Sequence, residues 1–360
     1  MSTNFIEIVQ IDAVKAHPNA DKLELACIRG SETAIQKGSF VAGDIVIFFP
    51  PDMLIPEHVG ELLGVKKYLK HSIMDGFKRQ CRVSACRLRG EPSYGFIIPY
   101  SHAPTKEAVP VGTNVDHWFD AQKYVPPVRT GCEESERDDA RFHQYTGIEK
   151  YDRYPEAIAP GTPVRITEKI HGTNSRVGII QTPAGEFEWM AGSHRVRRRR
   201  PEEGKRSLYW SPLDNPKLAE LITALHDGVH SVIVFGEIYG GTVQDMDYGV
   251  PGCTGYRVFD ISIDGKYADW SLVRSACQQC GIELVPLLYE GPFSHELVKE
   301  HTYGPTTLAT REEIKTSFKD REGCVITPLT ETFYAPTGGR LILKSVSDDY
   351  HDRKGAQDNE

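Results

Sequence analysis

The sequence predicts an α+β protein with two domains, the first of which consists almost wholly of short strands. The chain has 360 residues, and a single domain usually holds roughly 100–200 residues. Residues 1–100 contain short runs of β-type residues between clusters of Gly, Pro and Asn. From about residue 146 onward, strand-like runs alternate with helical stretches. This change of pattern indicates a mixed second domain.

The first domain is predicted to be a small closed barrel or sandwich, because its strands are short and turn residues separate them. Prolines and charged residues predominate between residues 101 and 145, which is typical of a linker. We place the first domain at residues 1–125 and a linker with a leading helix at 126–160. The runs that predict strands lie at residues 8–14, 23–28, 44–49 and 95–99.

The second domain is predicted at residues 161–350, and a polar tail follows at 351–360. Its strand-like runs have apolar residues in alternation, and its helical stretches have apolar residues at helical spacing. The supporting segments are strand-like runs at 163–180 and 231–239 and helical stretches at 215–228 and 271–280.

The composition is that of a globular protein, with 39% hydrophobic and 26% charged residues. These values exclude a mostly disordered chain, a collagen and a coiled coil. No run of about 18 apolar residues is present, so we expect no transmembrane helix and no membrane partner. The first residues lack the pattern of a signal peptide, and the eight cysteines are scattered. We therefore expect a cytoplasmic protein with reduced thiols.

Charge is distributed unevenly along the chain. The net charge is −8, which does not predict a nucleic-acid-binding protein. Residues 195–206, however, hold seven cations and only two acidic residues. A local basic run in an acidic chain indicates a binding site for a polyanion, although a solvated loop is an equally good reading of composition alone.

The most informative segment contains Lys169, which follows an alternating strand and precedes Gly172 by three residues. A lysine at this spacing from a glycine is a weak signal alone, because chance copies are common. Four later segments, in a fixed order, strengthen it. They are residues 234–240 (VFGEIYG), 256–262 (YRVFDIS), 322–327 (EGCVIT) and 340–344 (RLILK).

As an ordered set, these segments resemble the nucleotidyltransferase motifs of polynucleotide ligases and capping enzymes. The wording of residues 168–174 (EKIHGTN) and 234–240 is most similar to that of RNA ligases. The resemblance covers about residues 165–347.

Two segments of the first domain carry a second resemblance. Residues 17–23 (HPNADKL) and 87–96 (RLRGEPSYGF) are similar to the OB-type tRNA-binding domains attached to some aminoacyl-tRNA synthetases. An OB-like domain in front of a ligase core is the layout of the Deinococcus-type ATP-dependent RNA ligases. The resemblance implies an OB-like, RNA-binding β-barrel and then an adenylyltransferase domain of antiparallel sheets with flanking helices. It also implies a monomer.

The resemblance further implies an ATP-dependent RNA ligase that joins nicked or broken RNA ends. In such a reaction, the Lys169 amine attacks the α-phosphate of ATP, and a covalent lysyl-AMP forms as pyrophosphate leaves. AMP then passes to an RNA 5′-phosphate, and an RNA 3′-hydroxyl finally displaces AMP to join the strands.

A lysine amine is almost wholly protonated at neutral pH, because its ordinary pKa is about 10.4. A nucleophilic Lys169 therefore needs a lowered pKa. Glu237 and Glu322 are expected in the same pocket, and alone they would raise this pKa. A divalent cation held by these carboxylates would reverse the effect. We therefore expect Mg²⁺ or Mn²⁺ as a cofactor, with Glu237 and Glu322 as its ligands.

The resemblance assigns the other nucleotide contacts residue by residue. Lys344 is expected at the α-phosphate, although Ile342 stands where many ligases have another lysine and Arg340 is an uncertain substitute. Phe259 is expected to stack on adenine, with a plain core role as the alternative. The remaining expected nucleotide-binding residues are Glu168 at the adenine edge, Glu237 at the ribose, Gly172 and Asn174 on the turn, and Arg195 at phosphate.

RNA contacts are expected from His171 and from the basic run at Arg197, Arg198, Arg199 and Arg200. A turn-forming or capping role is an open alternative for His171 and Asn174.

Two other classes of protein are alternatives. A GTP-using capping enzyme or a DNA ligase typically has its OB domain after the last lysine motif, but only 16 residues follow Lys344. An RNA-binding protein with an inactive core is the second alternative. The presence of Lys169, Glu237 and Glu322 together argues against it.

Overall fold

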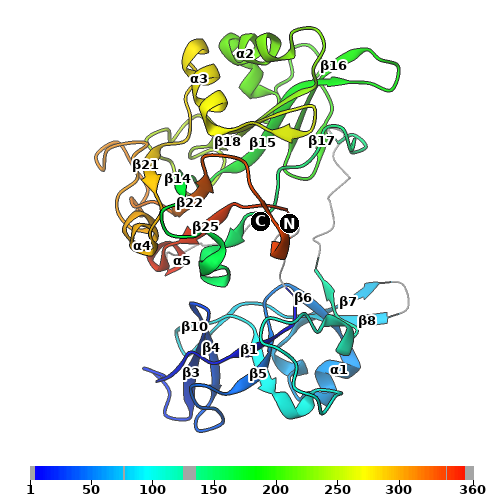
Figure 1. Cartoon of the computed structure of the whole chain (residues 1–360), viewed down its shortest axis with the longest axis vertical. Helices are drawn as coiled ribbons and strands as arrows, with labels where there is room; N and C mark the ends of the chain where they lie inside the picture. Colours follow the sequence, from blue (N-terminus) through cyan, green and yellow to red (C-terminus); the bar gives the residue numbers. More distant parts are fainter. Residues whose placement is uncertain (1–4, 76–77, 125–134, 338, 353–360) are drawn as a thin grey trace. The chain divides into compact units, whose positions relative to one another are not determined.

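The computed structural model describes residues 5–75, 78–124, 135–337 and 339–352. The chain divides into two compact units, residues 2–127 and residues 128–360, each of which is built around its own core (Figure 1). Strands predominate in both units, and helices are few. The predicted α+β class is therefore confirmed.

The first unit contains twelve strands and one α-helix among its described residues. Its sheets have the strand orders β1-β5-β11, β2-β3-β4, β12-β6-β8-β7 and β10-β9. The bounds are β1 (Glu7–Gln10), β2 (Ala13–Ala16), β3 (Leu23–Ile28), β4 (Ser31–Gln36), β5 (Ile45–Phe49), β6 (Met53–Pro56), β7 (Lys70–Asp75), β8 (Lys78–Arg82), β9 (Cys86–Leu88), β10 (Glu91–Ser93), β11 (Phe96–Pro99), β12 (Gln122–Lys123) and α1 (Glu57–Leu62).

The core of the first unit lies on β1, β5 and β11, whose apolar residues are buried in succession. Strand β5 is buried on both faces, because Ile47 and Phe49 pack in one apolar cluster and Val46 and Phe48 in another. A strand between two cores reads as a continuous apolar run instead of an alternating one. The sequence of β5 has this pattern.

The second unit contains two large sheets and a small two-stranded one. The five-stranded sheet has the order β13-β25-β22-β14-β21 and the six-stranded sheet β17-β16-β15-β18-β19-β20. Their strands are β13 (Glu149–Lys150), β14 (Pro163–Lys169), β15 (Thr173–Gln181), β16 (Phe187–Ser193), β17 (Arg197–Arg198), β18 (Val232–Tyr239), β19 (Gly255–Ile263), β20 (Lys266–Tyr267), β21 (Leu287–Pro292), β22 (Gly323–Pro328) and β25 (Leu343–Val346), with β23 (Phe333–Tyr334) and β24 (Gly339–Arg340) in the small sheet.

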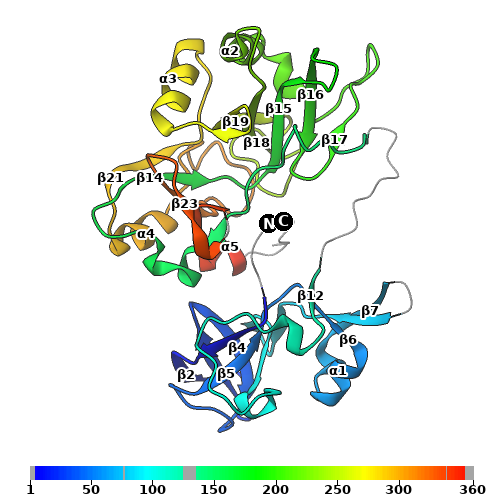
Figure 2. The ribbon, with the colours of Figure 1, turned by 45° about the vertical axis from the view of Figure 1, so that its right-hand side comes forward.

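Helices α2 (Pro216–His226) and α3 (Trp270–Cys280) lie side by side against one face of the six-stranded sheet (Figure 2). The alternation along β18 explains the two faces: Val232 and Val234 pack under these helices, whereas Ile233 and Phe235 pack on the opposite face. Helices α4 (His295–Thr302) and α5 (Asp348–Asp352) complete the unit, and α4 contacts β22 and β25.

Local signals determine the ends of α2 and α3. The Asn215 side chain accepts a hydrogen bond from the Lys217 backbone N–H at 3.1 Å, and Pro216 occupies the first turn of α2. Both features are typical of a helix N-terminus. Helix α3 ends at Gly281, which has a φ of 62°, a conformation that glycine adopts at little cost. These signals lie within a few residues of the predicted boundaries.

The described part of the segment predicted as a linker is an integral part of the second unit. Residues 135–160 pack into the second unit, where Phe142 and Tyr145 are buried and β13 pairs with β25. The predicted leading helix is absent from the described part of this segment, which has only the 3-10 turns Tyr151–Arg153 and Pro155–Ala157. The tail after residue 352 lies outside the described residues.

Candidate active site

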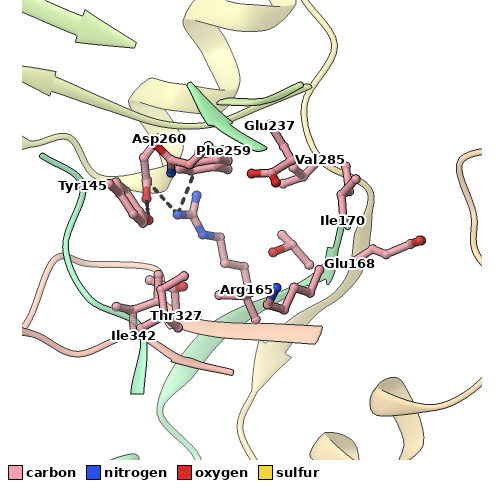
Figure 3. A pocket seen from close by; sticks show the side chains of 15 residues that line it. Tyr145, Arg165, Glu168, Ile170, Glu237, Phe259, Asp260, Val285, Thr327 and Ile342 are labelled. Carbon is pink, nitrogen blue, oxygen red and sulfur yellow. Dashed lines mark hydrogen bonds and ion pairs between the residues drawn. The ribbon is translucent and has the colours of Figure 1, made fainter. Parts of the chain in front are cut away.

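A cavity lies between the two large sheets of the second unit (Figure 3). Strands β14 and β22 of the five-stranded sheet and β15, β18 and β19 of the six-stranded sheet all contribute to its walls. The lining residues are Tyr145, Ile148, Arg165, Thr167, Glu168, Lys169, Ile170, Asn174, Glu237, Phe259, Asp260, Val285, Val325, Thr327 and Ile342.

Strand β14 separates the cavity from the apolar core. Arg165, Thr167 and Lys169 alternate along it and belong to the cavity lining, whereas Val164 and Ile166 pack in the core on the other face. This follows from the two-residue period of a strand. A polar residue at every second position of β14 therefore forms one wall of the cavity.

Glu168 also belongs to the cavity lining, but Figure 3 shows its side chain directed away from Glu237 and Phe259. Its carboxylate accepts hydrogen bonds from the backbone N–H and hydroxyl of Thr307, at 2.8 and 2.7 Å, and from the Thr306 hydroxyl. These bonds occupy its carboxylate, and a role for Glu168 at the adenine edge stays a prediction. The period of the strand turns its side chain away from the side that holds Lys169.

Lys169 lies at the end of β14, and its side chain is 20% exposed. Its Nζ donates a hydrogen bond to Glu322 Oε1 at 2.6 Å. Burial lowers the pKa of Lys169, but the negative charges of Glu322 and Glu237 outweigh burial and raise it above its ordinary value. The two carboxylates thus act on the lysine in the direction that the sequence predicted.

Glu237 lies on β18, opposite Asn174 in the register of β15. Burial raises the pKa of Glu237 to about 8, even though the charge of Lys169 acts in the opposite direction. Burial thus favours the neutral form of this carboxyl. Asn174 Oδ1, in the same cavity, is buried and has no hydrogen-bond partner among the described residues.

His171 is buried and bonded through both ring nitrogens. Its Nε2 lies 2.8 Å from Asp245 Oδ1, and its Nδ1 lies 2.9 Å from the Tyr350 hydroxyl and 3.9 Å from Glu322 Oε2. Tyr350 comes from α5, close to the carboxyl end of the chain. His171 thus connects the turn to Asp245 and Tyr350, and its contact with RNA stays a prediction.

Gly172 permits a close approach of two backbone segments. A Cβ at this position would lie 2.3 Å from the carbonyl oxygen of Ile238 and 2.9 Å from Glu237 Cγ. The sequence predicted a glycine here so that the backbone could come close to the nucleotide. In the structure, the backbone that comes close is β18, which holds Glu237.

Phe259 lines the cavity from β19, and its ring packs edge-on against Tyr145 with the centroids 4.8 Å apart. It also contacts the apolar clusters on either side. Phe259 therefore belongs to both the cavity wall and the core.

The next residue, Asp260, is the centre of a buried ion cluster. Its side chain accepts hydrogen bonds from Arg165 Nη2 and Arg340 Nη1, each at 2.8 Å, and from the Tyr145 hydroxyl. Burial raises the pKa of Asp260, but Arg340 and Arg165 more than offset this, so that its pKa lies below the ordinary value. Because β14, β19 and β24 each supply one charged residue, the cluster ties the sheets together beside the cavity.

Arg340 was an uncertain substitute for the lysine that is missing at Ile342. In the structure, Arg340 pairs with Asp260 and Glu331 and lies over the Tyr267 ring at 4.0 Å. These contacts give Arg340 a structural role. Ile342 itself lines the cavity, and Lys344 is buried two residues later, opposite Val325 on β22.

The basic run lies at the edge of the six-stranded sheet, and its arginines differ. Arg197 pairs with Glu136 and Glu188, at 3.0 and 3.2 Å. Arg198 lies over the Tyr209 ring at 5.0 Å, and Arg200 lies over Trp210 at 5.6 Å. The side chains of Arg199 and Arg200 are exposed.

Several residues near the site have positions or partners that the sequence did not predict. Arg195 lies in the turn between β16 and β17 and is not among the described residues that line the cavity. Roles for Arg165, Asp260 and Tyr350 were not predicted. One sequence signal could have indicated a buried, paired role for Arg165: it stands between two apolar residues of β14. A charged residue in such a position must be paired when it is buried.

Two carboxylates near Lys169 are suitable oxygen ligands for a divalent cation. No group of three or more His, Cys, Asp and Glu side chains suited to hold a metal occurs in the described part of the chain. Mg²⁺ is commonly held by only one or two carboxylates together with water and substrate phosphates.

No helix in the described residues is long and apolar enough to span a membrane.

Comparisons with known proteins agree with this architecture. A family model for RNA ligases matches residues 162–346, and a model for an OB-fold domain matches residues 5–100. No curated protein sequence gives a significant match.

Among solved structures, the chain is similar to several forms of the RNA ligase of Naegleria gruberi. A ligand-free variant of that ligase matches with a TM-score of 0.70 at 20% identity, over 97% of this chain and 98% of the other. A variant with ATP and Mn matches with a TM-score of 0.68 at 21% identity, over 97% and 98% of the two chains. A variant with AMP and Mn gives 0.70 at 20% identity, over 97% and 99%. The predicted order, an OB-like domain before a ligase-type nucleotidyltransferase domain, is confirmed.

Proposed function

Since this chain belongs to the RNA ligase family, we propose that it joins RNA ends with ATP through a covalent lysyl-AMP intermediate on Lys169. The observation that carries the proposal is the position of Lys169 at the end of β14, in the cavity and 2.6 Å from Glu322. Transfer of label from α-labelled ATP to the protein tests it. The presence of an OB-fold domain before the ligase domain supports membership of the Deinococcus-type group.

In the proposed reaction, the neutral amine of Lys169 attacks the α-phosphate of ATP, and the bond to the β-phosphate breaks as pyrophosphate leaves. AMP then passes to an RNA 5′-phosphate, and an RNA 3′-hydroxyl displaces it. Phe259 offers an aromatic face to the base. Glu237 offers a carboxyl to the ribose, and Lys344 offers a cation to the α-phosphate.

The carboxyl groups around Lys169 support a requirement for Mg²⁺ or Mn²⁺. Glu322 Oε2 is buried without a hydrogen-bond partner among the described residues, and Glu237 lies close enough to raise the pKa of Lys169. Two such carboxyls fit a hard cation. When bound, the metal supplies positive charge that lowers the pKa of Lys169 and offsets phosphate charge.

Metal binding is expected to weaken as the pH falls. The pKa of Glu237 is raised to about 8, so below this pH a metal must displace a proton from the carboxyl. The apparent affinity for Mn²⁺ should fall by up to about tenfold for each pH unit below 8. Calorimetric titration at several pH values measures this trend. In Glu237→Gln the trend should flatten, and an affinity in the unchanged protein that is constant below pH 8 would show that metal binding displaces no proton from Glu237.

The first unit is proposed to orient RNA for the second. The OB-fold match to residues 5–100 supports this, because OB folds commonly bind single strands. Exposed Arg199 and Arg200 are the best candidates in the basic run for contact with RNA phosphates. RNA with nicked or broken ends is the proposed substrate, and the protein is proposed to act as a monomer.

A chain that lacks residues 1–125 should still form lysyl-AMP but join RNA poorly, because the cavity belongs wholly to the other unit. The two activities are measured separately, by covalent labelling and by sealing of a nicked duplex. We expect labelling within about threefold of the full chain and sealing at least about tenfold slower, since the single-strand contacts proposed for the OB-fold unit are lost. Sealing at the full rate would show that the first unit does not orient RNA.

A further inference from the structure

The guanidinium of Arg165 is fixed in the wall of the cavity, and one of its nitrogens has no hydrogen-bond partner among the described residues. The side chain is 5% exposed. Its Nη2 donates to Asp260 Oδ1 at 2.8 Å and to the Phe259 carbonyl oxygen at 3.4 Å, and the group lies over the Trp270 ring at 4.2 Å. Figure 3 shows it between Asp260, Phe259 and Glu237. Contacts on two sides thus leave the guanidinium a single orientation.

Within the described part of the chain, Arg165 Nη1 is buried and has no hydrogen-bond partner. A buried donor without a partner is rare, and it is costly when the group is charged. A bound ligand with an acceptor atom would remove this cost. Because Arg165 belongs to the lining of the cavity, the ligand of that cavity is the natural source of the acceptor.

The spacing along β14 indicates which part of a nucleotide reaches Arg165. Arg165 and Lys169 line the same cavity and are four residues apart, which corresponds to roughly 13 Å along a strand. A nucleotide with its α-phosphate at Lys169 and its base against Phe259 therefore extends toward Arg165. The edge of the base farthest from the ribose comes closest to the guanidinium.

On that edge, adenine has an unprotonated ring nitrogen, N1, whereas N1 of guanine carries a hydrogen. A guanidinium has only donors. We propose that Arg165 Nη1 donates a hydrogen bond to N1 of adenine and is the residue that selects ATP over GTP. With GTP, the N1–H of guanine faces the Nη1 donor, and both donors are left without an acceptor. This inference rests on the proposed binding of ATP in the cavity and adds the atom that identifies its base.

Deaza analogues test the hydrogen bond without changing the fold. The full chain carrying Lys169→Ala is titrated calorimetrically with ATP, 1-deaza-ATP, 7-deaza-ATP and GTP in the presence of Mg²⁺, so that binding is measured without reaction. Replacing N1 by a C–H should weaken binding by about 10- to 100-fold, as expected for a hydrogen bond from a charged donor. Replacing N7 should change it by less than about threefold, because N7 is on another edge. Equal affinity for ATP and 1-deaza-ATP would overturn the proposal.

A variant then assigns the effect to Arg165. Adding Arg165→Met should remove the penalty for 1-deaza-ATP and reduce the preference for ATP over GTP. Arg340→Met is the matched control, since Arg340 binds the same Asp260 but does not line the cavity; it should keep the penalty. A penalty that persists in Arg165→Met would overturn the proposal. If that variant fails to fold, the analogue series in the Lys169→Ala chain decides.

The outcomes separate this inference from the proposed function. Suppose that ATP labels the protein covalently but that 1-deaza-ATP binds as tightly as ATP. This result would overturn the proposed role of Arg165 and leave the ligase proposal intact. A penalty for 1-deaza-ATP in a protein that never becomes labelled would support Arg165 and count against lysyl-AMP formation. Absence of ATP binding would overturn both.

Discussion

Lys169→Ala is expected to abolish covalent labelling by ATP, with a decrease of at least about a thousandfold. The amine is the only proposed nucleophile, and in the structure it lies in the cavity against Glu322. The measurement is radiolabel from α-labelled ATP that remains on the denatured protein in the presence of Mg²⁺. GTP, run in parallel, should give no label, because the proposal is for an ATP-dependent ligase.

Two further variants make this test specific. Lys169→Arg keeps a positive charge beside Glu322, but its guanidinium stays protonated and is not a nucleophile; it should also fail to label. Lys266→Ala, at an exposed position of β20, is the control and should label normally. Label that survived in Lys169→Ala would identify another residue as the nucleophile. Label from GTP in place of ATP would indicate capping chemistry.

Asp260→Ala is expected to lower the free energy of unfolding of the second unit by about 3–5 kcal/mol. Asp260 is 1% exposed and pairs with both Arg165 and Arg340. Without it, two buried guanidinium groups lose their shared counter-charge. Removing one partner of a buried ion pair costs far more than the pair itself contributes, because the remaining charge stays desolvated.

Urea unfolding followed by tryptophan fluorescence measures this loss, since Trp270 stacks on Arg165 within the cluster. Glu202→Ala is a suitable control. Glu202 forms an exposed ion pair with Lys205, and exposed pairs contribute about 0–1 kcal/mol. A loss below about 1 kcal/mol in Asp260→Ala would mean that water or a rearrangement compensates for the charges, and that the cluster does not hold the sheets together.

Elements with strong local signals could be predicted from the sequence. Helices α2 and α3 and strands β14 and β18 lie close to their expected positions, because caps and apolar periodicity act over a few residues. The packing of residues 135–160 into the second unit could not be predicted from composition. The charged residues and prolines of this segment surround a few apolar side chains, such as Phe142 and Tyr145, whose burial depends on distant strands.

The same distinction applies to the site. Lys169, Glu237 and Phe259 stand in ordered motifs, and the structure brings them to one cavity. The side-chain direction of Glu168 depends on which face of β14 is turned toward that cavity, and this is decided by the packing of two sheets. The partners of Asp260 lie 95 and 80 residues away along the chain. Such long-range pairing leaves no mark in the local sequence.

Tyr350 gives the carboxyl end of the chain a direct contact with the surroundings of the lysine. Its hydroxyl lies 2.9 Å from His171, whose ring also approaches Glu322. The last dozen residues of a chain are often chosen as a site for fusion, immobilisation or truncation. Here a fusion partner attached beyond α5 would act on a helix whose Tyr350 contacts His171 in the turn after Lys169. Attachment through an exposed side chain such as Lys266 on β20 would leave this helix untouched.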